Sequence, residues 1–129
     1  MAATVETPAR QRVLIVDDEQ VVRAVTRLML ERNQFLVEEA ITAADALAGV
    51  QGATEPFTLI IVDYTLPDQT GLELIPQLRN LTPQSRLILT SGRPEADFPH
   101  HGADGYLAKP YTKEQLLSVV QTILATHQP

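Results

Sequence analysis

The sequence predicts a doubly wound α/β fold built on a five-stranded, mostly parallel β-sheet. Short runs of β-branched and aliphatic residues alternate along the chain with amphipathic segments long enough to form helices. The strongest runs are apolar at every position, which is typical of strands that helices cover on both faces. Right-handed crossovers between such strands place helices on both sides of the sheet.

The first predicted strand and helix occupy residues 12–16 and 19–32. The strand reads Arg-Val-Leu-Ile-Val and ends at two aspartates. In the helix, apolar residues recur every three or four positions and the arginines lie on the opposite side, as in an amphipathic helix. This apolar stripe consists of Val22, Val25, Leu28 and Met29.

The middle of the chain predicts a weaker strand at residues 35–39, an alanine-rich helix at residues 43–50 and a strong strand at residues 58–62. Gly52 follows the helix, in the place where glycine commonly ends one. The strong strand reads Thr-Leu-Ile-Ile-Val and ends at Asp63.

The third helix is expected to begin at a capping box. In this motif Thr70 and Glu73 each accept a hydrogen bond from the other's backbone N–H. Pro76 removes one helical hydrogen bond, so we expect a kink or a later helix start there.

The last part of the chain predicts two strands and a final helix. The strands are expected at residues 86–90 and 105–107. The helix begins after Thr112, whose hydroxyl can cap it. Its apolar stripe consists of Leu116, Leu117, Val120, Ile123 and Leu124.

Composition excludes several classes of function. The 129 residues include 16 acidic and 10 basic side chains, giving a net charge of −6, and the pI is about 4.9. Direct nucleic-acid binding is not expected, because phosphate contacts require a basic face. The absence of cysteine excludes disulfides, thiolate metal sites and a cysteine nucleophile. Without a signal-peptide core or a membrane-length apolar run, we expect no membrane association and a cytoplasmic location.

Five reactive side chains follow the predicted strands. Asp17 and Asp18 follow the first strand, Asp63 the third, Ser91 the fourth and Lys109 the fifth. These side chains should converge, because ligands of open α/β sheets bind at the carboxyl ends of the strands. Three carboxylates brought together repel one another, and a cation such as Mg²⁺ relieves that repulsion. Lys109 would supply a further positive charge.

Several short motifs follow one another along the chain. They are Val-Asp-Asp-Glu at 16–19, Asp63 followed by Leu66-Pro67 and Gly71, Thr90-Ser91-Gly92, and Gly102-Ala103 before Tyr106 and Lys109-Pro110. Together, in this order, these motifs resemble the receiver domain of bacterial response regulators, including those of chemotaxis. The resemblance runs from about Arg12 to Leu124 and implies the flavodoxin-like strand order 2-1-3-4-5.

The resemblance implies a phosphoacceptor. Asp63 would take a phosphoryl group from a histidine side chain and become an aspartyl phosphate. Lys109 would pair with Asp63 at rest and with a phosphoryl oxygen afterwards. Asp18 and Asp63 would bind Mg²⁺ directly and Asp17 mostly through water, and the backbone carbonyl of Thr65 would complete the protein ligands. Mn²⁺ could substitute for Mg²⁺.

The resemblance also implies a switch beside the phosphoacceptor. Ser91, with Thr90 as the alternative, would supply a hydroxyl that swings to the phosphoryl group. Tyr106 would then rotate inward and carry the change to the surface. Two positions that tune the lifetime of the phosphoryl group in this family correspond to Thr65 and Arg93. We hypothesise that Arg93 screens the phosphoryl group from water.

The stretch before Lys109 departs from the family pattern. It is about one helical turn short, taking ~3.6 residues for a turn. Pro94 and Pro99 bracket only a few residues, so the fourth helix of the family should be short or irregular here. The Lys109–Pro110 peptide bond would be cis in this family.

The resemblance assigns residues 12–126 to the receiver domain, residues 1–11 to a flexible tail and residues 127–129 to a second tail, with no output domain. Such a chain would receive its phosphoryl group from a sensor histidine kinase or a histidine phosphotransfer protein. It would then act on an unidentified downstream protein. It would not be an enzyme beyond catalysing its own phosphorylation and dephosphorylation, and dimerisation is not predicted.

Two other functions occur on similar sheets. An aspartate-dependent phosphatase requires a second acid two residues after its nucleophile, where this chain has Thr65. A flavodoxin-like flavin binder requires a loop rich in glycine and hydroxyl groups after the first strand. The acidic residues at 17–19 would repel a phosphate there. The receiver interpretation is therefore preferred.

Overall fold

The structure of the chain is a computed structural model that describes residues 10–125. Of the predicted tails, residues 1–9 and 127–129 lie outside the described residues. The helices and strands, in chain order, are β1 (Arg12–Val16), α1 (Gln20–Glu31), β2 (Leu36–Ala40), α2 (Ala43–Gly52), β3 (Leu59–Asp63), α3 (Gly71–Leu81), β4 (Arg86–Ser91), the 3₁₀ turn η1 (Glu95–Asp97), β5 (Gly105–Ala108) and α4 (Lys113–Ala125).

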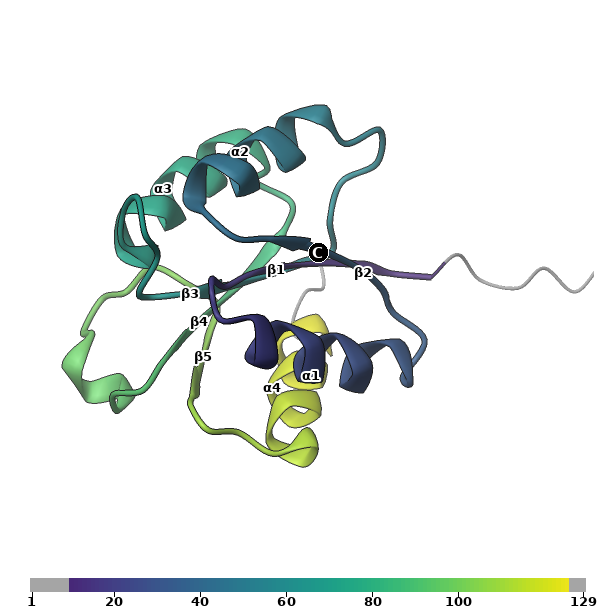
Figure 1. Ribbon diagram of the computed structural model, residues 1–129, viewed down its shortest axis with the longest axis vertical. Coiled ribbons are helices and arrows are strands. Elements are labelled where there is room, and N and C mark those ends of the chain that lie inside the picture. Colours follow the sequence, from purple (N-terminus) through teal and green to yellow (C-terminus); the bar gives the residue numbers. More distant parts are fainter. Residues whose placement is uncertain (1–9, 126–129) are drawn as a thin grey trace, which may run out of the picture.

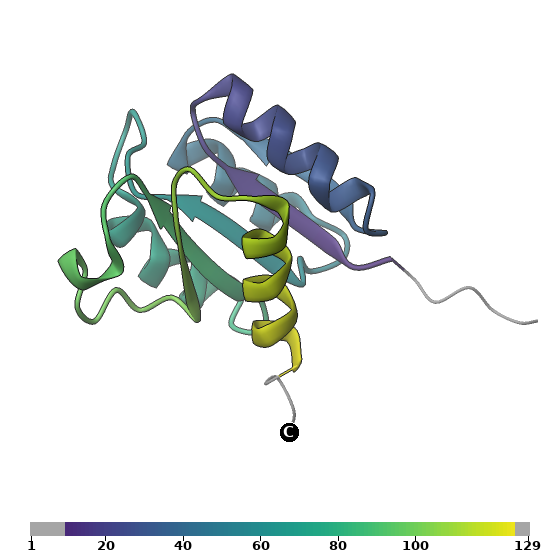
Figure 2. The same ribbon diagram turned by 90° about the horizontal axis from the view of Figure 1, so that it is seen from below.

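The predicted doubly wound fold is confirmed. The five strands form one sheet in the order β2-β1-β3-β4-β5, and all neighbouring strands are parallel. Helices α2 and α3 cover one face and α1 and α4 cover the other (Figures 1 and 2). Between residues 10 and 125 there is no helix long and apolar enough to cross a membrane.

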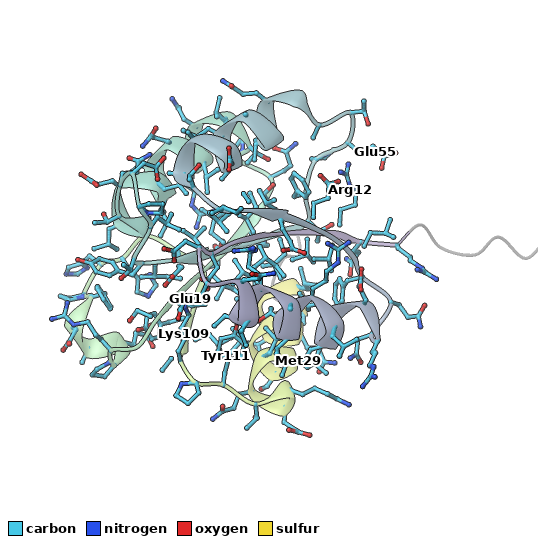
Figure 3. The ribbon with its side chains drawn as sticks, in the orientation of Figure 1. Arg12, Glu19, Met29, Glu55, Lys109 and Tyr111 are labelled. Carbon is cyan, nitrogen blue, oxygen red and sulfur yellow. The ribbon has the colours of Figure 1, made fainter. Side chains whose placement is uncertain are left out.

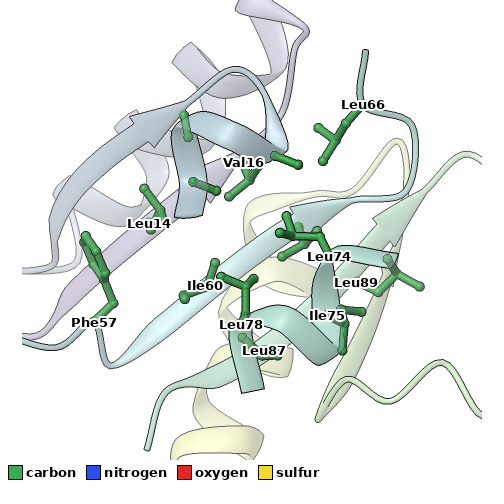
Figure 4. Close-up of a cluster of buried hydrophobic side chains, with 14 of the residues drawn as sticks. Leu14, Val16, Phe57, Ile60, Leu66, Leu74, Ile75, Leu78, Leu87 and Leu89 are labelled. Atoms are coloured by element: carbon green, nitrogen blue, oxygen red, sulfur yellow. The ribbon is translucent and has the colours of Figure 1, made fainter. Parts of the chain in front are cut away.

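Each face of the sheet builds its own hydrophobic core. Successive side chains of a strand point to opposite faces, so the continuous apolar runs of β1 and β3 supply both cores. On the face covered by α2 and α3, Leu14 and Ile60 pack against Leu74 and Leu78 (Figure 4). On the other face, Ile15, Ile61 and Ile88 pack with residues of α1 and α4: Leu30, Leu116, Val120 and Ile123.

The face of α1 that packs on the sheet differs from the predicted apolar stripe. Val25 and Leu28 are 46% and 48% exposed. The buried side chain of Arg23 instead donates a hydrogen bond to the backbone carbonyl of Asp17 (2.8 Å) and forms an ion pair with Glu39 (2.9 Å). These polar contacts orient α1 so that Val25 and Leu28 of the predicted apolar stripe face outward. The buried residues of α1 are Arg23, Thr26 and Leu30.

The predicted capping box is confirmed. Of the two effects expected from Pro76, a kink or a later start of α3, the later start is wrong. Thr70 and Glu73 cap the helix reciprocally, and it begins at Gly71. It continues through Pro76, because the cap and the buried aliphatic face outweigh the one hydrogen bond that proline removes. The prediction of a short or irregular fourth family helix is confirmed, since only η1 lies between β4 and β5.

Candidate functional site

The carboxyl edge of the sheet brings together the residues that follow its strands. Asp17 and Asp18 follow β1, and Asp63 is the last residue of β3. Ser91 ends β4, and Lys109 follows β5. All five predicted side chains therefore reach the same edge of the parallel sheet.

Three carboxylates form a compact cluster at this edge. Asp17, Asp18 and Asp63 each offer a carboxylate oxygen, and these oxygens lie within 4.8 Å of one another. Asp17 and Asp63 are 3% and 4% exposed, whereas Asp18 is exposed to solvent. A set of hard oxygen donors that is partly open to water fits Mg²⁺, which binds through one or two carboxylates and keeps several waters.

The ammonium group of Lys109 lies among carboxylates. Its Nζ atom is 2.9 Å from Asp17 Oδ2 and 3.2 Å from Asp63 Oδ2. A third contact, of 2.8 Å, joins it to Glu19 Oε1. The backbone N–H of Lys109 donates to the Ser91 carbonyl (2.7 Å), which holds the residue at the end of β4. The Lys109–Pro110 peptide bond is cis.

Burial and charge shift the proton equilibria of this pair. Burial, together with repulsion by Asp17, raises the pKa of Asp63 from 3.8 to about 6, although Lys109 and the backbone N–H of Thr65 oppose the shift. Burial by itself would lower the pKa of Lys109. Its hydrogen bonds to Glu19 and Asp17 outweigh that effect, so the pKa of Lys109 lies above its usual value. Lys109 is therefore a permanent cation in this site.

The backbone after Asp63 is held by two neighbouring segments. The N–H of Tyr64 donates to the Thr90 carbonyl, and the N–H of Gly71 donates to the Tyr64 carbonyl, both at 2.8 Å. A Cβ atom on Gly71 would lie only 2.5 Å from the carbonyl oxygen of Asp63. Glycine is therefore required where the start of α3 meets the end of β3. The backbone N–H of Thr65 acts to lower the pKa of Asp63, and a metal contact of the Thr65 carbonyl stays a prediction.

The hydroxyl groups of Ser91 and Tyr106 are joined by a hydrogen bond of 2.6 Å. Ser91 also accepts a hydrogen bond from the backbone N–H of Arg93 (2.9 Å), and the Tyr106 hydroxyl donates to the Arg93 carbonyl. Thr90, the alternative hydroxyl, is buried in β4 in register with Asp63. The structure therefore links Ser91, rather than Thr90, directly to Tyr106.

An aromatic cluster takes the place of a regular fourth family helix. The buried Phe98 ring lies 4.7 Å from the ring of Tyr64 and 6.0 Å from that of Tyr106. His101 also packs against Tyr106, at 5.9 Å between ring centroids. The guanidinium of Arg93 lies over Phe98 and pairs with Asp97 at 3.3 Å. Phe98 had no predicted role, although it is the one large apolar residue between the two prolines.

Two residues of the β1–α1 segment also lacked a predicted role in the site. The backbone N–H of Glu19 donates to Asp17 Oδ1 (2.8 Å), and its carboxylate reaches Lys109. Arg23 holds the carbonyl of Asp17 from the first turns of α1. The pattern along the helix gives no signal for the inward orientation of Arg23, because its partners, Asp17 and Glu39, lie in other segments.

A groove of about 390 Å³ opens beside the Lys109 side chain. It runs between the exposed stripe of α1 and the segment after β5, where Figure 3 shows Met29 and Tyr111. Thr26 Oγ1 and the Tyr111 hydroxyl, 2.6 Å apart, tie the two walls together. The apolar lining consists of Val21, Val22, Val25, Met29, Pro110 and Tyr111.

Comparison with known proteins agrees with this geometry. The transcriptional regulatory protein KdpE of Escherichia coli K12 is 36% identical over 118 residues, which cover 89% of this chain and 52% of the relative. A CheY-like receiver domain of Methanospirillum hungatei JF-1 superposes with a TM-score of 0.82 at 32% identity, covering 91% of this chain and 95% of that one. A response regulator of Burkholderia pseudomallei, at 32% identity, superposes with a TM-score of 0.76 and covers 89% and 69%.

The chain spans about half the length of the curated relatives that it matches. Residues 13–121 match the family model described as the response regulator receiver domain. That match covers most of the chain, including every strand-end residue of the site. The chain therefore belongs to the family of response regulator receiver domains, the phosphoacceptor domains of two-component signalling.

Proposed function

We propose that Asp63 is the phosphoacceptor of this receiver domain and that its donor is a sensor histidine kinase or a histidine phosphotransfer protein. The observation that carries the proposal is the position of the Asp63 carboxylate. It is buried at the end of β3, 3.2 Å from the Lys109 ammonium and within the acidic cluster. The crystal structure of the Burkholderia pseudomallei relative contains a phosphorylated aspartic acid and a calcium ion, which supports the assignment.

The acidic cluster fits a divalent cation. Asp17, Asp18 and Asp63 would hold Mg²⁺, with the Thr65 carbonyl as the predicted fourth protein ligand and Mn²⁺ as a substitute. When bound, the cation neutralises negative charge on the phosphoryl oxygens. Each of the three side chains offers a hard carboxylate oxygen, and these oxygens lie within 4.8 Å of one another, close enough to share one cation.

The transfer is a substitution at phosphorus. A carboxylate oxygen of Asp63 forms a bond to phosphorus while the bond between phosphorus and the donor's imidazole nitrogen breaks. The bonding electron pair leaves with that nitrogen. Lys109 would stabilise the phosphoryl oxygens by charge-assisted hydrogen bonds from a fixed position. Catalysis by this chain is limited to its own phosphorylation and dephosphorylation.

The phosphoryl group would act on the rest of the domain through Ser91. To reach a phosphoryl oxygen, the Ser91 hydroxyl breaks its hydrogen bond to the Tyr106 hydroxyl. The Tyr106 side chain is then free to reorient. The direct contact of the two hydroxyls favours Ser91 over Thr90 as the switch. The roles of Thr65 and Arg93 in phosphoryl lifetime stay predictions.

The groove beside Lys109 is where we propose that the histidine-bearing donor docks, because its apolar wall adjoins the reacting groups. The downstream partner is a protein rather than nucleic acid, in line with the net charge of −6. We propose a cytoplasmic location for this exchange.

The test is phosphorylation by a small donor. The protein is incubated with Mg²⁺ and acetyl phosphate, and its intact mass is measured. We expect one added phosphoryl group in the wild type and none in Asp63→Asn or in the presence of chelator. Asp45→Asn, a matched change at an exposed position of α2, should label like the wild type. An Asp63→Asn variant that still gains the group would refute the assignment.

A further inference from the structure

Lys109 has a carboxylate partner outside the acidic cluster. Glu19 Oε1 lies 2.8 Å from Nζ, the shortest of the three contacts of this ammonium group. Glu19 and Lys109 are 90 residues apart in the chain and meet beside the start of α1 (Figure 3). The Glu19 carboxylate is not among the three that could share a cation.

The position of Glu19 in the helix leaves its side chain free for this contact. Glu19 is the N-cap residue of α1, but its side chain makes no capping hydrogen bond. Its backbone is anchored instead, because its N–H donates to Asp17 Oδ1 at 2.8 Å. The carboxylate therefore extends from a fixed base across to the end of β5.

The three contacts use all the donors that Lys109 has. A lysine ammonium carries three N–H groups and accepts no hydrogen bond. Here they face Asp17, Glu19 and Asp63. The contact with Asp63 is expected to pass to a phosphoryl oxygen when Asp63 is phosphorylated. A stronger hold of the phosphoryl group on Lys109 therefore requires that Asp17 or Glu19 gives up its own contact.

Glu19 is the partner that is released at least cost. Its side chain is 59% exposed, so water can solvate the carboxylate once the contact breaks. The side chains of Asp17 and Asp63 are 4% and 5% exposed. A buried carboxylate left without its cation carries a much larger desolvation penalty than an exposed one.

We propose that Glu19 is a positioning residue that holds Lys109 in the resting domain and competes with the phosphoryl group for it. This inference rests on the proposed function of Asp63. It follows that Glu19 slows phosphorylation and weakens the binding of phosphoryl mimics. Loss of the contact between Glu19 and Lys109 should raise the phosphorylation rate and the affinity for phosphoryl mimics, each by about two- to fivefold, the range typical of a half-exposed ion pair.

Two variants separate this role from simple charge repulsion. Glu19→Gln removes the charge and weakens the contact with Lys109. Glu19→Asp keeps the charge near the site but shortens the side chain by one methylene, so the contact is lost. Competition for Lys109 predicts a gain in both variants, whereas repulsion of an anionic donor predicts a gain in Glu19→Gln alone.

The experiment measures equilibrium binding of beryllofluoride with Mg²⁺, from backbone amide NMR shifts near Asp63, and the initial rate of phosphorylation by acetyl phosphate. Glu55→Gln makes the same charge change at the opposite end of the sheet, far from Lys109 in Figure 3, and should match the wild type. We expect tighter beryllofluoride binding and faster labelling, each by about two- to fivefold, in both Glu19 variants.

A gain in Glu19→Gln alone, no change in either variant, or slower labelling in both would overturn the competition. A wild-type protein that neither binds beryllofluoride nor gains a phosphoryl group would instead refute the function of Asp63, and the role of Glu19 with it. The two failures are therefore distinguishable by the behaviour of the wild type.

Discussion

At the scale of single residues, Asp63 is held in a state that favours its neutral form. Burial and the neighbouring Asp17 raise its pKa from 3.8 to about 6, even with Lys109 at 3.2 Å. A group whose pKa rises on folding binds more protons in the folded state. Its contribution to stability is therefore full below pH 3.8 and is lost as the pH rises through about 6. Near neutral pH, without a cation, the charged Asp63 destabilises the fold.

We accordingly expect Asp63→Asn to be more stable than the wild type at pH 7.5 in the presence of chelator. The gain should approach, at most, about 3 kcal/mol, because one pKa unit corresponds to about 1.4 kcal/mol. Urea unfolding between pH 4 and 8 measures the difference. It should shrink as the pH falls below 6 and close near pH 4, and a difference independent of pH would contradict the prediction.

Binding of the cation should also stabilise the fold, and this effect should depend on Asp18. Mg²⁺ should stabilise the wild type against unfolding. At a concentration ten times its dissociation constant, it should raise the free energy of unfolding by about 1.4 kcal/mol. The exposed Asp18 is the ligand whose loss should disturb the fold least, so Asp18→Asn should lose most of this stabilisation. Melting curves in a Mg²⁺ series measure it, with Asp45→Asn as the control. Equal stabilisation of both variants would remove Asp18 from the ligand set.

At the scale of secondary-structure elements, the site depends on how closely α3 approaches β3. A Cβ atom on Gly71 would lie 2.5 Å from the Asp63 carbonyl and 3.0 Å from Tyr64 Cα, and neither backbone atom can move independently. We expect Gly71→Ala to destabilise the fold by about 1–3 kcal/mol, as overpacking does elsewhere, and to slow phosphorylation.

Gly49 provides the matched control for this prediction. It lies inside α2, and a Cβ atom there would meet nothing within 4 Å. Gly49→Ala should therefore stabilise the protein by about 0.5–1 kcal/mol, through helix propensity alone. Denaturant unfolding of both variants tests the comparison, and equal effects of the two substitutions would argue against the close approach at Gly71.

The elements also show where sequence patterns succeed. The apolar run at residues 58–62 predicts a buried strand, because a strand with apolar side chains on both faces must be covered on both, and the observed strand β3 is buried at every position. The outward stripe of α1 could not be predicted in this way. Its periodicity marks an apolar face, but the helix is oriented by Arg23, which bonds to a carbonyl and a carboxylate of two other segments. Val25 is left lining the groove beside Lys109, and Leu28 is left exposed.

At the scale of the whole molecule, β4 and β5 connect the site to the surface, and we propose that a change at the site travels along this connection. Ser91 at the end of β4 bonds to Tyr106 of β5, and Tyr106 packs against Phe98 and His101. With only η1 in place of a regular helix, we expect the response to concentrate on β5 and residues 92–104.

We predict that beryllofluoride with Mg²⁺ shifts the NMR signals of Tyr106 and its neighbours in the wild type. Ser91→Ala should lose most of these shifts, because alanine has no hydroxyl group that could leave Tyr106 and bond to beryllofluoride. Thr90→Val, which removes the alternative hydroxyl, should keep them. The reverse pattern would assign the switch to Thr90.

The amino-acid sequence by itself determined where the strands and helices follow one another along the chain and which side chains lie at the carboxyl edge of the sheet. Both follow from local information, namely apolar runs, caps and the residue after each strand. The partners of those side chains were decided only by the tertiary structure. Lys109 meets Glu19, and Tyr106 meets Phe98 and His101, through contacts between separate segments. Such contacts depend on which donors and rings reach one another once the sheet and its helices have packed together. No periodicity along the chain encodes those distances.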